Sequence, residues 1–244
     1  MNTFLTEARQ TLVPSDEVKH GPLPPLLVGL TLVTGLVDAF SYLALGHVFV
    51  ANMTGNVVFL AFALAGAPGF SILASLIALA SFVLGALGGG LLGSRLGQHR
   101  GHLLSVAATL QALLLGASVV LAALAGNPLS TGVSYGLIIV LGVAMGLQNA
   151  TARKLAVPDL TTTVLTLTIV GIAADSRLVG GSGSKAGRRL ISVGAMFVGA
   201  LLGSLLIFHV SIVFPLVIAF IIKVLIAGTS RVLSRTDPAW VHAS

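Results

Sequence analysis

Long apolar runs alternate with short polar linkers along most of this chain. Six of the runs approach the roughly 20 residues that a helix needs to cross a hydrocarbon core of ~30 Å. They span residues 24–45, 71–94, 103–125, 132–152, 189–209 and 211–230. Two shorter runs, 48–66 and 160–175, are apolar but rich in small polar side chains. The pattern predicts an all-α polytopic membrane protein with six to eight transmembrane segments.

The predicted spans form a single membrane domain, residues 24–230, between two polar ends. Residues 1–23 are mixed and polar and lack the apolar stretch of a signal peptide, so we expect a cytoplasmic N-terminal tail. Residues 231–244 are expected to form a cytoplasmic C-terminal tail.

Composition agrees with a lipid environment. Of the 244 residues, 56% are hydrophobic and only 8% are charged, whereas a soluble domain carries about 25% charged residues. The absence of cysteine excludes disulfides, thiolate metal sites and cysteine nucleophiles. Because no nucleotide-binding loop, catalytic triad or HExxH motif occurs, we expect neither an enzyme nor a cofactor or metal site.

The formal charge of +6 could indicate a nucleic-acid partner, but the basic residues form no continuous face with polar or aromatic readers. They cluster at the ends of the apolar runs instead: Arg95/Arg100, Arg153/Lys154, Arg177/Lys185/Arg188/Arg189 and Arg231/Arg235. Lys and Arg mark cytoplasmic loops in this way. We therefore expect a multi-pass membrane protein with both termini in the cytoplasm and no nucleic-acid partner.

Self-comparison suggests that the membrane domain contains two related halves, residues 24–126 and 132–230. Three pairs of elements align in the same order: residues 35–39 with 146–150, residues 52–56 with 164–168, and Gly85/Gly89 with Gly199/Gly203. The composition is biased, so each match is weak alone. Their common order favours a repeat.

The number of spans decides how the halves are oriented. If all eight runs cross, the halves are parallel and basic loops lie on both faces. If the two short runs are broken or re-entrant helices, six spans remain, the halves are inverted, and the basic loops share the cytoplasmic face. Such segments at matching positions of inverted halves are typical of secondary transporters. Eight plain helices, with short polar second and sixth members, are the alternative.

Asp38 is the strongest single candidate for a functional residue because it lies inside an apolar run, Leu26–Leu45. An ionised carboxylate there costs a few kcal/mol or more, so either the group is protonated or a partner or water cavity sustains its charge. It could couple transport to protons or cations, or it could tie helices together by hydrogen bonds. Its repeat mate is the neutral Asn149. Lys223 could reach the interface or pair with Asp38 or Asp175.

Polar and small residues of the two repeated segments are the candidate lining of a solute path. They are Asp38, Ser41, Asn52, Thr54, Gly55, Asn56, Gln148, Asn149, Thr163, Thr166 and Thr168. The alternative role for such residues is hydrogen bonding between helices, worth only about 0.6 kcal/mol per contact.

A second set of small residues predicts close helix packing. Gly85, Gly89 and Gly93 recur at four-residue spacing, and Gly199 and Gly203 echo them. Such spacing clears one helix face for another backbone, either within the chain or in a homodimer.

The segment Thr34–Asn56 carries the pattern TG-x-x-DA-x-SYL-x-LG-x-VF-x-AN-x-TGN. It resembles the opening signature of the bacterial YoaK-like membrane proteins, a family defined as a domain of unknown function. Met145–Ala150 and Thr162–Thr168 are similar to its second signature, with Leu167 in place of the usual Gly. The resemblance implies a bacterial inner-membrane protein and implies no substrate.

The function that these features favour is a small-solute transporter or permease, passive or linked to protons through Asp38. The alternative is a structural or regulatory membrane scaffold whose glycines dock a partner. Besides the bilayer, the expected partners are an unidentified small solute and a second copy of the chain. A transporter predicts that the two polar segments meet near the membrane midplane, whereas a scaffold predicts a dry, packed bundle.

Overall fold

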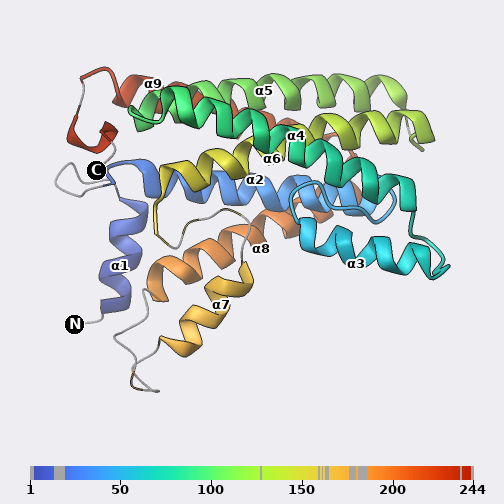
Figure 1. Cartoon of the computed structure of the whole chain (residues 1–244), viewed down its shortest axis with the longest axis horizontal. Helices are drawn as coiled ribbons and strands as arrows, with labels where there is room; N and C mark the ends of the chain where they lie inside the picture. The colour runs from blue at the N-terminus through green and yellow to red at the C-terminus, as the bar shows by residue number, and fades with distance from the viewer. Residues whose placement is uncertain are drawn as a thin grey trace.

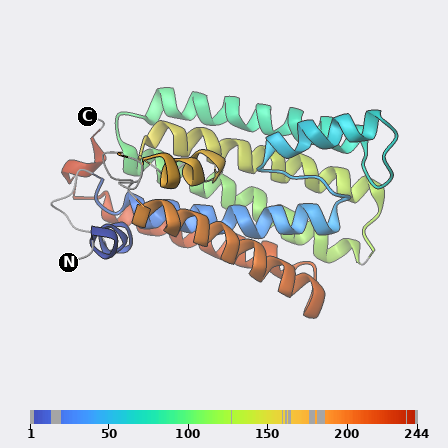
Figure 2. The same cartoon turned by 90° about the horizontal axis from the view of Figure 1, so that it is seen from below.

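The computed structural model describes residues 3–13, 20–126, 128–158, 160, 162, 165–175, 180, 186–236 and 238–242. Within this part of the chain, six long helices lie side by side along the longest axis of the molecule (Figures 1 and 2). They are α2 (Leu23–Ala44), α4 (Ile72–Leu96), α5 (Arg100–Ala125), α6 (Thr131–Leu155), α8 (Ala186–His209) and α9 (Phe214–Leu233). Each has 20 to 26 residues and is apolar enough to cross a bilayer. The fold is therefore that of an all-α polytopic membrane protein.

Local sequence explains where several of these helices begin. The side chains of Ser71 and Ser130 accept hydrogen bonds from backbone N–H groups in the first turns of α4 and α6. The His99 ring does the same for α5. These bonds satisfy N–H groups that have no partner within the helix. Prolines occupy the first turns of α2 and α9, where a missing N–H costs nothing.

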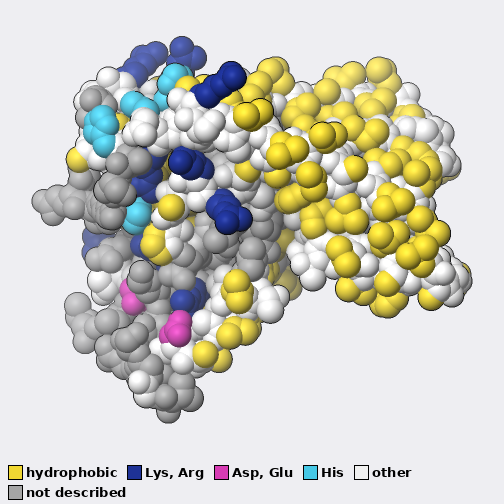
Figure 3. Space-filling view, in the orientation of Figure 1, with side chains coloured by type: hydrophobic (Ala, Val, Ile, Leu, Met, Phe, Trp, Pro, Cys, Tyr) yellow, Lys and Arg dark blue, Asp and Glu magenta, His cyan; other side chains and the backbone are white. Residues whose placement is uncertain are grey.

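Successive long helices run antiparallel, and this arrangement gathers the charge at one end. That end holds the starts of α2, α5 and α8, the finishes of α4, α6 and α9, and the short helix α1 (Thr3–Leu12). Among the described Lys and Arg residues, only Lys223 lies away from it, and Figure 3 shows the basic and histidine side chains gathered there. We call it the basic end and the opposite one the apolar end.

Large apolar side chains cover much of the outer surface. Several are more than 60% exposed: Leu84, Leu87, Leu91, Leu113, Leu124, Phe197 and Leu225. Figure 3 shows hydrophobic side chains covering the part of the molecule away from the basic end. Contiguous exposed apolar surface on this scale is unfavourable in water and suits a surface that faces lipid.

The two short runs form α3 (Met53–Leu64) and α7 (Leu165–Ala174), of 12 and 10 residues. At 1.5 Å per residue these helices are roughly 18 and 15 Å long, too short to cross a bilayer. Each begins near the middle of the long axis, but α3 runs to the apolar end and α7 to the basic end (Figures 1 and 2). Within the described residues each short run supplies only a half-length helix, which favours six complete spans over eight.

Candidate functional site

The loop between α2 and α3 turns back into the molecule and is held there by Asp38. This residue lies in α2 about two turns before the helix ends, and it is only 3% exposed. Its Oδ1 accepts hydrogen bonds from the backbone N–H groups of Val50, at 3.2 Å, and Ala51, at 2.9 Å. The carboxyl group thus satisfies donors that lipid could not satisfy, and it fixes the depth at which α3 begins.

Asn56 secures the same loop from the first turn of α3. It is fully buried, and its Oδ1 accepts a hydrogen bond from the Phe49 N–H at 2.9 Å. Its Nδ2 donates to the Phe49 carbonyl oxygen at 2.6 Å. The side-chain amide replaces a backbone partner in both directions, which is the requirement of non-helical chain at membrane depth.

Two buried polar atoms among the described residues have no hydrogen-bond partner. They are Oδ2 of Asp38 and Oγ1 of Thr162. Thr162 is 1% exposed, has a φ of 63° and lies shortly before α7, as the Asp38 carboxyl lies against the segment before α3. An unsatisfied buried polar group costs about 1–3 kcal/mol. One such atom therefore accompanies the entry to each half-helix.

The beginnings of α3 and α7 point toward one another in the middle third of the molecule, in both perpendicular views (Figures 1 and 2). The first turn of a helix presents N–H groups without intrahelical partners and carries a partial positive charge. Opposed half-helices of this kind concentrate hydrogen-bond donors at one depth.

Lys223 forms a second polar centre inside the bundle. It lies in α9, is 1% exposed, and donates hydrogen bonds to the side-chain oxygens of Gln111 in α5 and Gln148 in α6. Gln148 Nε2 in turn donates to Thr34 Oγ1 of α2 at 2.8 Å. Four helices thus meet around one buried amine. Thr34 precedes Asp38 by one turn of α2, so both polar centres use the same helix.

This centre corrects the prediction for Lys223. The side chain neither reaches the interface nor pairs with Asp175, whose carboxylate binds Arg189 at 2.8 Å near the start of α8. Within the described residues it forms no ion pair with Asp38 either. Sequence reasoning missed Gln111, although a lone Gln inside the uncharged run 103–125 was a usable signal.

Two of the other predicted path residues donate hydrogen bonds to nearby backbone. Ser41 is buried and donates to the Asp38 carbonyl oxygen at 3.2 Å, and Asn149 donates to the Met145 carbonyl oxygen at 2.9 Å. A Cβ at Gly55 would lie 2.7 Å from the Phe49 ring. Gly55 therefore allows α3 to pack closely against its own entry loop.

The predicted threonine and asparagine positions are not brought together as one cluster. Thr54 and Thr166 are exposed on the surfaces of α3 and α7, whereas Thr168 is buried at 8% exposure. Asn52 is half-buried immediately before α3. Thr163 lies outside the described residues. Within those residues, no three His, Cys, Asp or Glu side chains are grouped as metal ligands.

The predicted packing glycines face other helices of the same chain. Gly85, Gly89 and Gly93 of α4 are buried against α6, where a Cβ would meet the backbone near Val143 and Leu147 or the Lys154 side chain. Gly199 and Gly203 of α8 are buried against α2 near Leu32 and Leu36.

These glycine contacts occur in matching pairs. A Cβ at Gly35 would collide with the carbonyl oxygen of Met196 and the amide of Ala200; at Gly146 it would collide with the same atoms of Phe82 and Ala86. Likewise, Gly203 faces Ala39 and Leu36, and Gly89 faces Ala150 and Leu147. The α2–α8 contact thus has the same construction as the α6–α4 contact.

Comparison with known proteins identifies the family. The family described as "Protein of unknown function (DUF1275)" matches residues 26–229, and the chain belongs to it. It is similar to the UPF0700 transmembrane protein YoaK of Bacillus subtilis (strain 168), with 38% identity over 152 residues. That match covers 62% of this chain and 65% of the relative. No solved structure matches the chain.

Proposed function

We propose that this DUF1275 member is a small-solute transporter whose site lies between the facing beginnings of α3 and α7. The opposed half-helices are the observation that carries the proposal. Interrupted helices at membrane depth require protein or a watery cavity to satisfy their backbone. Secondary transporters use pairs of them to bind substrates near the bilayer midplane. The unpartnered atoms of Asp38 and Thr162 support a polar occupant at this depth.

The proposal includes two inverted halves. The matching contacts of Gly35 and Gly146 support it, because a two-fold relation would exchange α2 with α6 and α8 with α4. The same relation exchanges α3 with α7, which run to opposite ends of the molecule. Alternating exposure of the site would then follow from rocking of one half against the other.

The orientation follows from charge. Lys and Arg are retained on the cytoplasmic side during insertion, so the basic end is assigned to the cytoplasm of a bacterial inner membrane. Both termini would lie on that side, and the last turn of α3 would lie on the outer side of the membrane.

Asp38 is proposed as the group that links transport to protons. A carboxyl inside a membrane span is costly when charged, and its Oδ1 is already occupied by two backbone donors. The buried Oδ2 remains to take up and release a proton. Release would be coupled to substrate movement if both events require the loop before α3 to shift.

The glycine contacts count against the alternative of a membrane scaffold that docks a partner. A docking role would require the glycine stripe of α4 to be open to a partner, but Gly85 and Gly89 are buried against α6. The stripe is already used within the chain.

Osmotic swelling of proteoliposomes tests the proposal without a labelled substrate. Vesicles are shrunk with a panel of neutral, cationic and anionic small solutes, and the re-swelling caused by solute entry is followed by light scattering at several pH values. We expect at least one solute to enter faster than in protein-free vesicles. Its entry should lose its pH dependence in Asp38→Asn but keep it in Asp175→Asn, which removes an exposed carboxylate. The absence of any accelerated solute across the panel would overturn transport.

A further inference from the structure

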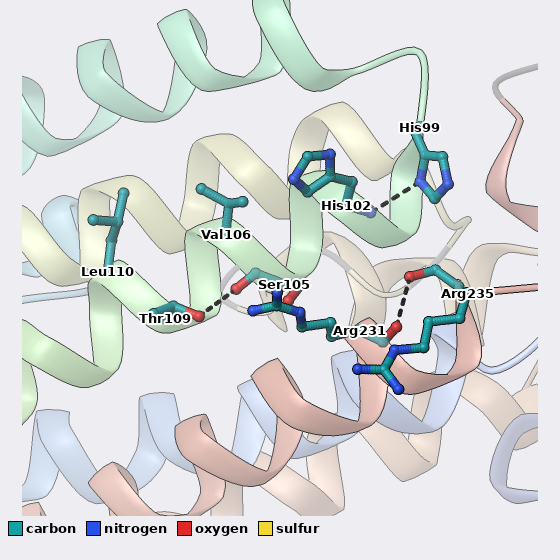
Figure 4. Close-up of a pocket in the computed structure, with 9 residues that line it drawn as sticks. His99, His102, Ser105, Val106, Thr109, Leu110, Arg231 and Arg235 are labelled. Carbon is teal, nitrogen blue, oxygen red and sulfur yellow. Dashed lines mark hydrogen bonds between the residues drawn. The ribbon is translucent and has the colours of Figure 1, made fainter.

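A separate cavity opens at the basic end between α5 and α9 (Figure 4). Its volume is about 440 Å³, and nine described residues line it: His99, His102, Ser105, Val106, Thr109, Leu110, Arg231, Ser234 and Arg235. It lies away from the half-helices α3 and α7, neither of which contributes to its wall. Nothing in the proposed transport mechanism uses it.

The chemistry of the lining changes with depth. The outer part holds two arginines, Arg231 and Arg235, which lie one turn apart at the end of α9. In Figure 4 the Arg231 side chain extends from α9 toward Ser105 and Thr109 of α5. Toward the middle of the molecule, the lining contains the apolar Val106 and Leu110 together with Thr109. His99 to Leu110 spans roughly 16 Å along the helix axis.

The positive charge of the cavity is not neutralised by the described protein. None of the nine lining residues is Asp or Glu. No described carboxylate forms an ion pair with either arginine. The ion pair found among the described residues joins Arg189 to Asp175, outside this cavity. Two guanidinium groups in a concave site are suited to a phosphate oxyanion, which accepts several charge-assisted hydrogen bonds.

An apolar cavity suited to an acyl chain adjoins this one at Leu110. Leu110 also lines a second cavity of about 430 Å³ between α4, α5 and α6. Its walls are entirely apolar: Leu84, Gly85, Gly88, Leu92, Leu110, Leu113, Leu114, Val143 and Leu147. A phosphate bound at the arginines would leave its apolar substituent at Leu110, where this second cavity begins.

We propose that the α5–α9 cavity binds an anionic phospholipid, with its phosphate at Arg231 and Arg235 and an acyl chain along Leu110. Basic pockets between helices on the cytoplasmic side recognise such headgroups. The adjoining apolar cavity, which shares Leu110, favours a lipid over free phosphate because inorganic phosphate has no apolar part to place in it.

Native mass spectrometry of the full-length protein in detergent tests the site directly. Phosphatidylglycerol and phosphatidylcholine with identical acyl chains are titrated in parallel, and bound lipid is counted. We expect phosphatidylglycerol to bind more tightly. The Arg231→Gln/Arg235→Gln variant should bind it about thirty-fold more weakly, or about 2 kcal/mol, as expected for two arginines near the membrane surface. The control Arg95→Gln/Arg153→Gln removes two exposed arginines from the same end but outside the cavity, and it should bind normally.

A second variant separates occupancy from charge and from folding. Thr109→Trp fills the cavity from an exposed position on α5 without changing charge, so it should also displace the lipid. Three results would overturn the proposal: equal binding of both lipids, equal losses in the two double-arginine variants, or competition by millimolar inorganic phosphate with no dependence on acyl chains. None of these results bears on solute flux.

Discussion

Lys223 of α9 donates a hydrogen bond to Gln148 of α6 inside the bundle, where both side chains are almost completely buried. The two residues lie in different spans and, together with Gln111, connect three of the six long helices. A buried amine that loses a hydrogen-bond partner is left with an uncompensated desolvation cost. The pair therefore couples the positions of α6 and α9.

This pairing predicts strong energetic coupling. Gln148→Leu should destabilise the protein, and much less so in a Lys223→Met background, where no buried amine needs a partner. The expected interaction free energy is about 1–3 kcal/mol, the cost of leaving a buried polar group without its partner. A double-mutant cycle from unfolding in mixed detergent measures it. Additive effects within about 0.5 kcal/mol would show that the two side chains act independently.

The Asp38 bonds predict different outcomes for two substitutions. Asp38→Asn keeps an oxygen that accepts from Val50 and Ala51, so thermal stability should change little. Asp38→Leu has the same branched arrangement of side-chain heavy atoms but leaves both backbone donors unsatisfied, at a cost of about 2–5 kcal/mol. Thermal unfolding in detergent compares them. Equal melting temperatures for the two variants would contradict the role of Asp38 in holding the loop before α3.

The glycine stripes predict a sharp contrast between neighbouring positions. Gly85→Ala places a methyl group against the Val143 carbonyl oxygen and should destabilise by about 1–3 kcal/mol. Gly88→Ala, in the same helix, faces open space and should be neutral or stabilising by up to about 1 kcal/mol.

Thermal unfolding of glycine variants in detergent measures these costs and also tests whether the two halves pack equivalently. Gly199→Ala should match Gly85→Ala, because each Cβ would collide with a backbone carbonyl of the helix it faces. Gly194→Ala is the matched control on α8, since its Cβ would face open space. Substantially different costs at Gly85 and Gly199 would count against equivalent packing in the two halves.

The absence of cysteine makes the orientation directly measurable. Single cysteines at Ala65, after α3, and at Ala174, in the last turn of α7, lie at opposite ends of the molecule. A membrane-impermeant maleimide added to intact cells should label Ala65→Cys. Ala174→Cys, like Gln98→Cys between α4 and α5, should react only after the membrane is opened. Labelling of Ala65→Cys and Ala174→Cys from the same side would exclude the inverted arrangement.

Run length and hydropathy determined the positions of the six long spans, because lipid obliges each crossing segment to satisfy its own backbone. The clustering of basic residues at run ends was equally visible, and the structure gathers those charges at one end. Asp38 and Asn56 could be singled out because polar side chains are rare in apolar runs. Their bonds also reach only a short way along the chain, to residues between them.

The partners of Lys223 could not be predicted in this way. Gln111 and Gln148 come from spans that become its neighbours only when the helices pack, and hydropathy does not specify which spans pack together. For the same reason, the sequence allowed two packing partners for the glycines of α4: another helix of the same chain, or a helix of a second copy. Only tertiary packing decided between them, because the face that a span presents to protein or to lipid depends on which helix lies beside it.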